Sequence, residues 1–463
     1  MDSLLQSRFF TQKKITWFLI FYSMLVFWLT KDIVGNDSTT YIGYFEGWKL
    51  GRYTYWYDIK DYIPDTFRNP GFPFVIAILC TISKKIIFLQ LAQFIIYCIT
   101  LVLLIRIITK NYSNTSVPLL FFGGITFLNP VLPLYNSLIV PEVLTGFLIV
   151  LILYTRMFSV ENYKKYVLTG ILFAVLFQVR PIVLFLPFIL FVSDWLVQRK
   201  NFAFIKNATV LLIYVVSMLP YGYWNYKTHG IFTVTSIEGG GGVLHLGYWS
   251  LKMPGFTERR YWNNGTERGL ISFTPESEVK QNIEAFNREW DYIDSSCAKY
   301  LTDKDRRNIE YMVADGARFV TYNGRYTYER EKLLKQLAFK HYTEDWRYTL
   351  KIKIYTFFRL WVTGLSKNDL QHASGFEKIK MWIPVITTGF TFLLALLFIP
   401  LALIKRKINF TYWLPVLLTI AYWGGIHIPF AIQARYTIPV RLLLILLTAI
   451  SVYELYFRKK EEN

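Results

Sequence analysis

Residues 86–108 read IIFLQLAQFIIYCITLVLLIRII, an apolar run in which Arg106 is the charged residue. A helix needs about 20 apolar residues to cross the hydrocarbon core of a bilayer. Backbone groups in lipid must bond within their own segment, so such a run predicts a helix. Similar runs recur at Ile15–Thr30, Val210–Tyr223, Trp382–Ile404 and Leu442–Tyr456. The sequence therefore predicts an all-α polytopic membrane protein.

The composition and the placement of charge agree with this class. Of the 463 residues, 53% are hydrophobic and 18% are charged, against about a quarter charged in a typical soluble domain. The net charge is +19, yet residues 251–350 carry 17 Lys and Arg against 16 Asp and Glu, a difference of +1. The excess therefore belongs to the short loops between apolar runs, which is the positive-inside pattern and not a nucleic-acid footprint.

The basic clusters also predict the topology. They occur at Arg8 to Lys14, Arg106 and Lys110, Arg156 to Lys165, Arg199 to Lys206, Lys405 to Lys407, and Arg458 to Lys460. With these clusters and both termini in the cytoplasm, the chain crosses the membrane about ten times. No small-residue cleavage site follows the first run, so we expect an uncleaved first span. The short segment Phe72–Ile82 leaves the count at 10–11, as a full span or as a half-helix.

Three parts follow from this topology. Residues 1–223 form a transmembrane core, with residues 31–71 as its first outer loop. Residues 224–350 are polar and mixed in charge, and form an extracytoplasmic, partly helical domain with helices expected over Glu278–Trp290 and Arg306–Phe319. Residues 351–463 begin with an interfacial helix over Lys351–Val362 and continue as three membrane helices.

Two acidic residues fall at the predicted outer ends of membrane segments. Asp37 follows the first span, where a carboxylate can accept a proton from an incoming hydroxyl group. Its alternative role is to cap a helix that starts at Ser38. Glu142 lies in an otherwise apolar stretch, which favours a functional role, although Pro141 before it also suits the start of a helix.

Three arginines map to the same side of the membrane. Arg68 precedes a Pro-Gly turn, Arg180 separates two apolar segments, and Arg435 follows the next-to-last span. A guanidinium group matches the oxygens of a phosphate in pairs, so each is a candidate for binding an anionic headgroup. Each is equally well explained as an anchor at the membrane interface. Because two acids and three arginines fall on the same side of the membrane, we predict that they form a common site.

Other signals are absent from the sequence or have a plain explanation. Gly239 to Gly242 lacks the Lys-Ser/Thr of a phosphate loop and reads as a hinge. The five histidines show no metal-ligand spacing, and no dinucleotide fingerprint is present. The sequence therefore indicates no cofactor and no metal-ligand motif, and it leaves a bound divalent cation open. His427 can line a cavity or pack within its helix.

Short motifs follow one another in order along the apolar part of the chain. They are Asp37 and Tyr41 with Gly51 and Tyr53, Arg68 to Pro73, Pro141-Glu142 with Leu144 and Phe147, Gly170 to Arg180-Pro181, Pro220 with Trp224-Asn225 and Gly230 to Phe232, and Arg435-Tyr436 with Pro439. This ordered set resembles the C-type (GT-C) glycosyltransferase superfamily. It is most similar to the bacterial branch near protein O-mannosyltransferases and lipid A aminoarabinose transferases.

The resemblance implies a metal-independent, inverting transfer of a sugar from a polyprenyl-phosphate donor to an extracytoplasmic glycan, lipid or protein acceptor. In that reading Asp37 is the base and Glu142 orients the acceptor. Arg68, Arg180 and Arg435 hold the donor phosphate, and the cavity is lined by Tyr41, Tyr436, His427 and Asn225. Two positions depart from the family pattern: Ser38 stands where an acid often follows Asp37, and Gly71 replaces one of two prolines.

Two other functions remain open from the sequence. A transporter or flippase of lipid-linked sugars is expected to carry polar residues near the bilayer midplane. A polymerase of lipid-linked oligosaccharides would also have a large outer loop. In all three cases we expect a cell-membrane protein in contact with lipids and a polyprenyl-linked sugar.

Overall fold

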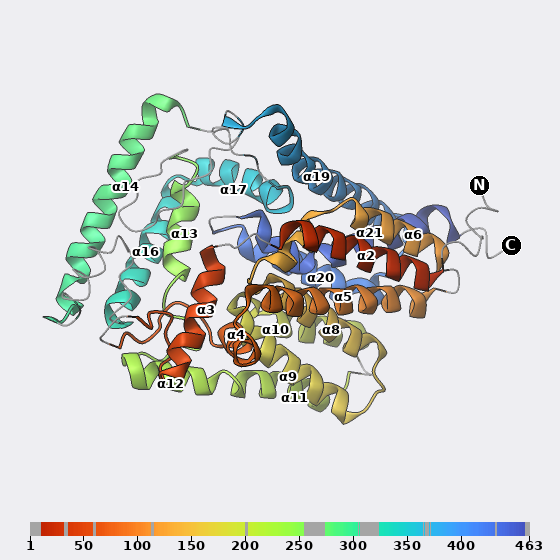
Figure 1. Cartoon of the computed structure of the whole chain (residues 1–463), viewed down its shortest axis with the longest axis horizontal. Helices are drawn as coiled ribbons and strands as arrows, with labels where there is room; N and C mark the ends of the chain where they lie inside the picture. Colours follow the sequence, from red (N-terminus) through yellow and green to blue (C-terminus); the bar gives the residue numbers. More distant parts are fainter. Residues whose placement is uncertain are drawn as a thin grey trace.

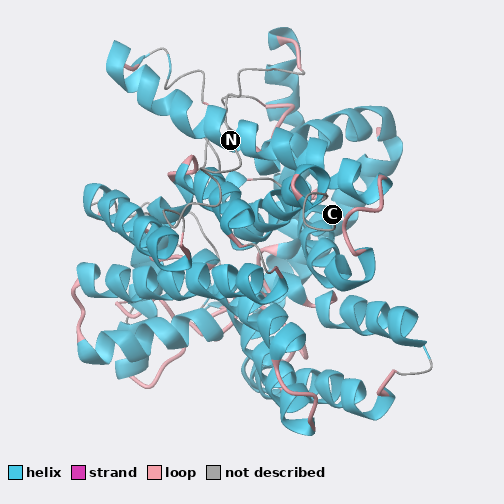
Figure 2. Cartoon of the chain, turned by 90° about the vertical axis from the view of Figure 1, so that its right-hand side faces the viewer, coloured by secondary structure: helices cyan, strands magenta, loops and turns pink. Residues whose placement is uncertain are grey.

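The structure is a computed structural model. It describes residues 11–31, 36–58, 62–112, 115–199, 202–253, 274–303, 305, 324–363, 365, 370, 372–430 and 433–458. Every regular element in these ranges is a helix (Figure 2). The predicted all-α class is therefore confirmed. The helix expected over Arg306–Phe319 lies outside the described residues.

The apolar helices pack into one bundle. In chain order they are α2 (Gln12–Thr30), α4 (Gly71–Ile82), α5 (Ile86–Asn111), α6 (Ser116–Phe127), α7 (Val131–Leu134), η2 (Tyr135–Ser137), α8 (Glu142–Phe158), α9 (Tyr163–Val179), η3 (Pro181–Val183), α10 (Leu186–Gln198), α11 (Phe204–Val216), α12 (Leu219–His229), α19 (Gly375–Ile404), α20 (Phe410–His427), η6 (Ala434–Thr437) and α21 (Ile438–Tyr456). α21 lies at its centre, almost entirely buried, and contacts α6, α8, α19 and α20. A helix that is apolar on all sides is expected in such a central position.

The membrane character of the bundle is confirmed by the length and composition of its helices. Among the described residues, six helices are long and apolar enough to cross a membrane, or seven if the bent pair of Ser116–Phe127 and Val131–Ser137 is one span. The six are Gln12–Thr30, Ile86–Asn111, Pro181–Gln198, Phe204–His229, Gly375–Ile404 and Ala434–Tyr456. The predicted count of 10–11 segments is reached only if the shorter or less apolar helices α4, α8, α9 and α20 are added to these candidates. α4 is a 12-residue helix, as the sequence suggested for this segment.

The polar part of the chain forms a second helical unit at one end of the bundle (Figure 1). It contains α13 (Gly240–Trp249), α14 (Glu276–Cys297), η5 (Ala298–Tyr300) and α16 (Gly324–Glu344). Its core is aromatic, with Trp249, Phe286 and Trp290 buried together. The helix predicted over Glu278–Trp290 lies within α14. The expected boundary at residue 224 falls inside α12, which continues to His229.

Two further helices, α3 (Asn36–Lys49) and α17 (Trp346–Trp361), complete the fold. α3 follows α2, and α17 contains most of the predicted interfacial helix. Buried Arg441 donates from its guanidinium group to Ala434 O at 3.2 Å and to Leu360 O in the last turn of α17 at 3.4 Å. Cations favour the carbonyl end of a helix, so Arg441 fixes η6 against the end of α17.

Candidate active site

Asp37 lies between two arginines from distant parts of the chain. Its Oδ1 pairs with Nη2 of Arg68 at 3.1 Å, and its Oδ2 pairs with Nη1 of Arg435 at 2.7 Å. The alternative role for Asp37 was a cap before a helix that starts at Ser38. α3 instead begins at Asn36, which places Asp37 in its first turn. Both carboxylate oxygens of Asp37 bind guanidinium groups.

Glu142 extends this arrangement from the first residue of α8. Its Oε1 lies 3.3 Å from Nη1 of Arg180 and 3.9 Å from Nε of Arg435. Arg435 therefore links the two carboxylates. We call Asp37, Arg68, Glu142, Arg180 and Arg435 the charged cluster. The prediction that these five residues come together is confirmed.

The charged cluster is part-buried, not sealed. The side chain of Glu142 is 1% exposed, whereas those of Asp37 and Arg435 are 29% and 27% exposed. Within the described part of the chain, Glu142 Oε2 and the Nε atoms of Arg68 and Arg435 have no hydrogen-bond partner. Buried polar groups are normally paired, so the cluster retains capacity to bind a further polar group.

The electrostatics keep Asp37 ionised. Burial alone would raise the pKa of its carboxyl group, but the attraction of Arg435 and Arg68 outweighs burial and lowers that pKa. If all five groups are ionised, three positive and two negative charges leave the charged cluster with a net charge of +1. A site of this kind attracts an anion.

Asp65 positions Arg68 and was missed by the sequence analysis. Its Oδ2 accepts the backbone N–H groups of Phe67 at 3.0 Å and Arg68 at 2.9 Å, and its Oδ1 accepts the hydroxyl group of Tyr44 at 2.8 Å. Burial raises the pKa of the Asp65 carboxyl group to about 6. An Asp side chain that accepts the backbone N–H two residues further along the chain is typical of a turn. This local pattern was the feature of the sequence that could have identified Asp65.

Gly71 brings the Arg68 loop close to Arg180. A Cβ atom on Gly71 would lie 2.4 Å from the carbonyl carbon of Gln178 and 2.6 Å from the nitrogen of Val179. Only a residue without a side chain fits such an approach. The glycine that departs from the family pattern therefore lets the start of α4 touch the end of α9, next to Arg180.

Ser38 is the other position that departs from the family pattern, and like Gly71 it holds two segments of the chain together. Its buried hydroxyl group accepts the backbone N–H of Ile139 at 3.1 Å. Ile139 lies in the loop that leads into α8 and Glu142. A neutral hydroxyl group at this position therefore ties the start of α3 to the segment that presents the second acid.

Aromatic rings form the walls around the arginines. The guanidinium carbon of Arg68 lies 5.3 Å from the ring centre of buried Tyr41, and that of Arg180 lies 5.4 Å from the ring centre of Tyr436. His427 lies behind Tyr436, with ring centres 5.2 Å apart. It is buried and its Nδ1 bonds Trp423 O at 2.7 Å, which supports packing within its helix.

Asn225 is separated from the charged cluster by one loop. Its amide group donates to Thr233 O at 2.7 Å and Thr235 O at 3.3 Å. The next residue of that loop, Ser236, donates its backbone N–H to Asn69 Oδ1 at 2.8 Å. Asn225 therefore supports the loop that holds the neighbour of Arg68.

Comparisons with known proteins give one structural likeness. No protein-family model and no curated protein matches the sequence. The chain is similar to the crystal structure of ArnT from Cupriavidus metallidurans bound to undecaprenyl phosphate, with a TM-score of 0.40 and 10% sequence identity. The match covers 94% of this chain and 77% of that chain.

Proposed function

We propose that this chain is a membrane glycosyltransferase that moves a sugar from a polyprenyl-phosphate donor to an acceptor hydroxyl group. The observation that carries the proposal is the pairing of Asp37 with both Arg68 and Arg435 at the ends of membrane helices. Such a site combines a carboxylate that can take a proton with cations that can hold a phosphate. Its place at helix ends suits a donor whose lipid tail stays in the bilayer.

The donor phosphate binds to Arg68 and Arg435 in this proposal. Guanidinium groups bind phosphate oxygens in pairs, and these bonds are stronger than those between neutral groups. The Nε atoms of both arginines lack a hydrogen-bond partner among the described residues, so each guanidinium group has a donor to offer. Arg180 adds a third positive charge on the Glu142 side. These charges stabilise a leaving phosphate as preorganised donors do.

Asp37 accepts the proton of the acceptor hydroxyl group. The hydroxyl oxygen attacks the anomeric carbon, the bond from that carbon to the phosphate oxygen breaks, and the proton passes to Asp37. A single displacement of this kind inverts the anomeric configuration. The polyprenyl phosphate leaves as an anion that stays bound to Arg68 and Arg435, while Glu142 orients the acceptor.

Donor binding also prepares the base. Without donor, Arg68 and Arg435 both lower the pKa of Asp37, which makes it a weak proton acceptor. A phosphate that draws these two guanidinium groups toward itself weakens their hold on Asp37, and the pKa of the carboxyl group rises. A base is most effective when its pKa approaches the working pH, so the carboxylate gains basicity when the donor is in place.

A transporter or flippase of lipid-linked sugars is the principal alternative. Its polar residues are expected near the bilayer midplane, at broken helices. The charged cluster also lies at helix termini, since Glu142 begins α8, Arg180 follows α9 and Arg435 precedes α21. An assay of bond cleavage therefore separates a transporter from a transferase. A polymerase of lipid-linked oligosaccharides differs only in its donor, so the two are separated by assay.

The test is sugar transfer by the purified chain in lipid nanodiscs, with a panel of polyprenyl-phosphate and polyprenyl-diphosphate sugars. We expect turnover with a monophosphate donor, release of polyprenyl phosphate and an inverted product linkage. Turnover with diphosphate-linked oligosaccharides alone would identify a polymerase. Movement of labelled lipid-linked sugar across the bilayer without cleavage would overturn the proposal in favour of a flippase.

Topology gives an independent prediction. In a cysteine-free background, Lys332→Cys on α16 should react with a membrane-impermeant maleimide in intact cells. Val160→Cys, in the loop after α8, should react only after the cells are permeabilised. Both side chains are well exposed, so labelling reports their side of the membrane. The opposite pattern of labelling would place the charged cluster on the cytoplasmic side.

A further inference from the structure

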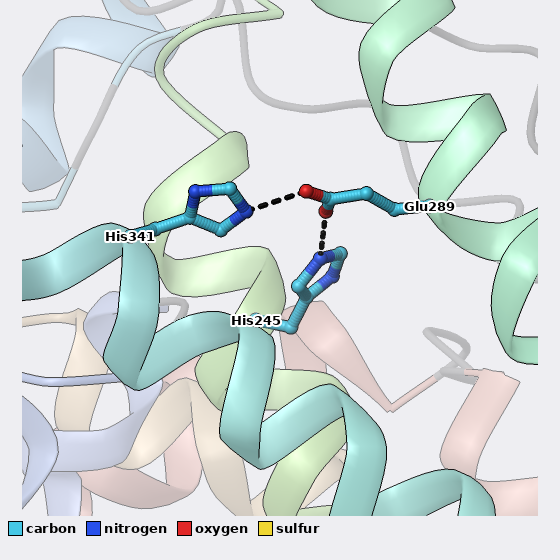
Figure 3. A group of neighbouring side chains, drawn as sticks. All are labelled: His245, Glu289 and His341. Carbon is cyan, nitrogen blue, oxygen red and sulfur yellow. Dashed lines mark hydrogen bonds and ion pairs between the residues drawn. The ribbon is translucent and has the colours of Figure 1, made fainter. Parts of the chain in front are cut away.

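A second polar cluster lies in the second helical unit, between α13, α14 and α16. His245 of α13, Glu289 of α14 and His341 of α16 point toward one another (Figure 3). Nε2 of His245 lies 2.7 Å from Oε2 of Glu289, and Nε2 of His341 lies 2.6 Å from Oε1 of the same carboxylate. We call these three residues the histidine cluster. It shares no residue with the charged cluster.

The ligand atoms of the histidine cluster are close enough to share one metal ion. One nitrogen from each imidazole and one oxygen of Glu289 all lie within 4.8 Å of one another. Zinc binds such atoms at about 2.0–2.2 Å, so ligand atoms around a tetrahedral ion lie about 3.3 Å apart. Both N···O distances therefore need to open by only about 0.6 Å to admit the ion, a shift within the reach of side-chain rotation.

The surroundings hold the ligands in place. The His341 ring stacks on Tyr248 with ring centres 4.5 Å apart, and the His245 ring stacks on Phe286 at 5.7 Å. Without an ion, the indole N–H of Trp249 donates to the candidate ligand atoms themselves, with Glu289 Oε2 at 3.0 Å and His245 Nε2 at 3.1 Å. The two stacked rings restrict the rotation of both imidazole groups. The three candidate ligands are thus held close together before any ion binds.

We propose that the histidine cluster binds a zinc-class divalent metal ion. Two imidazole nitrogens and one carboxylate oxygen suit zinc, cobalt or nickel, whereas magnesium and calcium prefer oxygen ligands throughout. Three protein ligands leave one position of a tetrahedral ion for water. Burial lowers the pKa of His245, which favours the neutral imidazole that a metal requires.

The proposed ion cross-links α13, α14 and α16, and through α13 it reaches the bundle. A Cβ atom on Gly247 of α13 would lie 2.5 Å from Pro429 O, so the helix touches the segment after α20. Tyr342 of α16 and Lys353 of α17 also donate to Pro429 O. These contacts join the histidine cluster to the segment that leads toward Arg435. The ion therefore cross-links the helices of the second helical unit.

The alternative is a hydrogen-bonded triad that binds no metal. In that case both histidines hold Glu289, and their hydrogen bonds lower the pKa of its carboxyl group to about 2 even though burial opposes this. The alternative predicts that added zinc binds no better to the parent chain than to a variant that lacks a histidine ligand. Metal content therefore separates the two possibilities.

The experiment measures zinc retained by the full chain, purified without a histidine tag, stripped with chelator, equilibrated with zinc and dialysed. We expect one zinc per chain by mass spectrometry, and loss of that zinc in His341→Gln and Glu289→Gln. His372→Gln is the matched control, because His372 is exposed and lies outside the histidine cluster.

Spectroscopy and thermal unfolding give two further readouts. Cobalt added to the stripped parent should give the intense visible absorption of tetrahedral coordination, and zinc should abolish it by displacement. Zinc should also raise the unfolding temperature of the parent and of His372→Gln, but not that of His341→Gln. Retention of zinc by His341→Gln and Glu289→Gln at the parent's level, or no zinc and no cobalt spectrum in the parent, would overturn the proposal. None of these outcomes depends on sugar transfer.

Discussion

Asp37→Asn is expected to lower turnover by about 10²–10⁴-fold, the usual contribution of a positioned acid or base. The amide keeps the shape of the carboxyl group and can still accept a hydrogen bond from Arg435 or Arg68. It cannot take a proton from the acceptor hydroxyl group. Donor affinity should stay the same or rise, because ionised Asp37 competes with the donor phosphate for Arg68 and Arg435. A fall in turnover without weaker donor binding is the pattern of an interaction lost in the transition state. Steady-state kinetics with the identified donor measure both quantities.

The control for Asp37→Asn is Asp194→Asn. Asp194 of α10 also pairs with an arginine, Arg156 of α8, outside the charged cluster. Its amide variant therefore reports the general cost of weakening an ion pair in the bundle and should retain parental turnover. A purified Asp37→Asn protein that turns over like the parent would show that Asp37 is structural, and the mechanism would be wrong.

Arg435→Ala is expected to weaken donor binding by about 1.5–3 kcal/mol, the range for a hydrogen bond to a charged group. Arg435 contacts Asp37 directly and lies 3.9 Å from Glu142. Its loss removes both a phosphate ligand and the link between the two acids. Arg435→Lys should restore only part of the affinity, because an ammonium group cannot form the bidentate contact. Titration with a labelled polyprenyl phosphate in nanodiscs gives the affinity.

Arg68→Ala should weaken donor binding over the same range, since Arg68 holds the other oxygen of Asp37. Arg156→Ala is the matched control, because it removes a guanidinium group from the Arg156–Asp194 pair. It should leave donor affinity unchanged. If Arg435→Ala and Arg68→Ala both bind donor as the parent does, the arginines serve only to pair with the acids.

Most of the fold followed from local sequence. Apolar runs predicted the membrane helices, because a helix in lipid must satisfy its own backbone. The prediction at Lys351–Val362 was shorter than the observed α17, since polar residues from Trp346 onward continue the helix. The run Val210–Tyr223 is divided between α11 and α12, where Pro220 lies at the start of the second helix. Periodicity does not reveal a break of this kind.

Part of the candidate site also followed from sequence. The positive-inside rule placed Asp37, Glu142 and three arginines at the same ends of their helices, and the structure brings them together. Asp65 was missed because its role is to bind backbone, a contact that a sequence motif shows only weakly. Ser38 and Gly71 looked like departures from a family pattern, and their reasons became visible only in the packing.

The sequence by itself determined the class of this protein, the order of its helices and the end at which its charges gather. These properties depend on hydrophobicity and charge within single segments, which act locally along the chain. The tertiary structure alone decided that Asp37 meets Arg435 across 398 positions and that His245, Glu289 and His341 converge. Such contacts depend on how the faces of several helices pack, and no spacing within one segment records that packing.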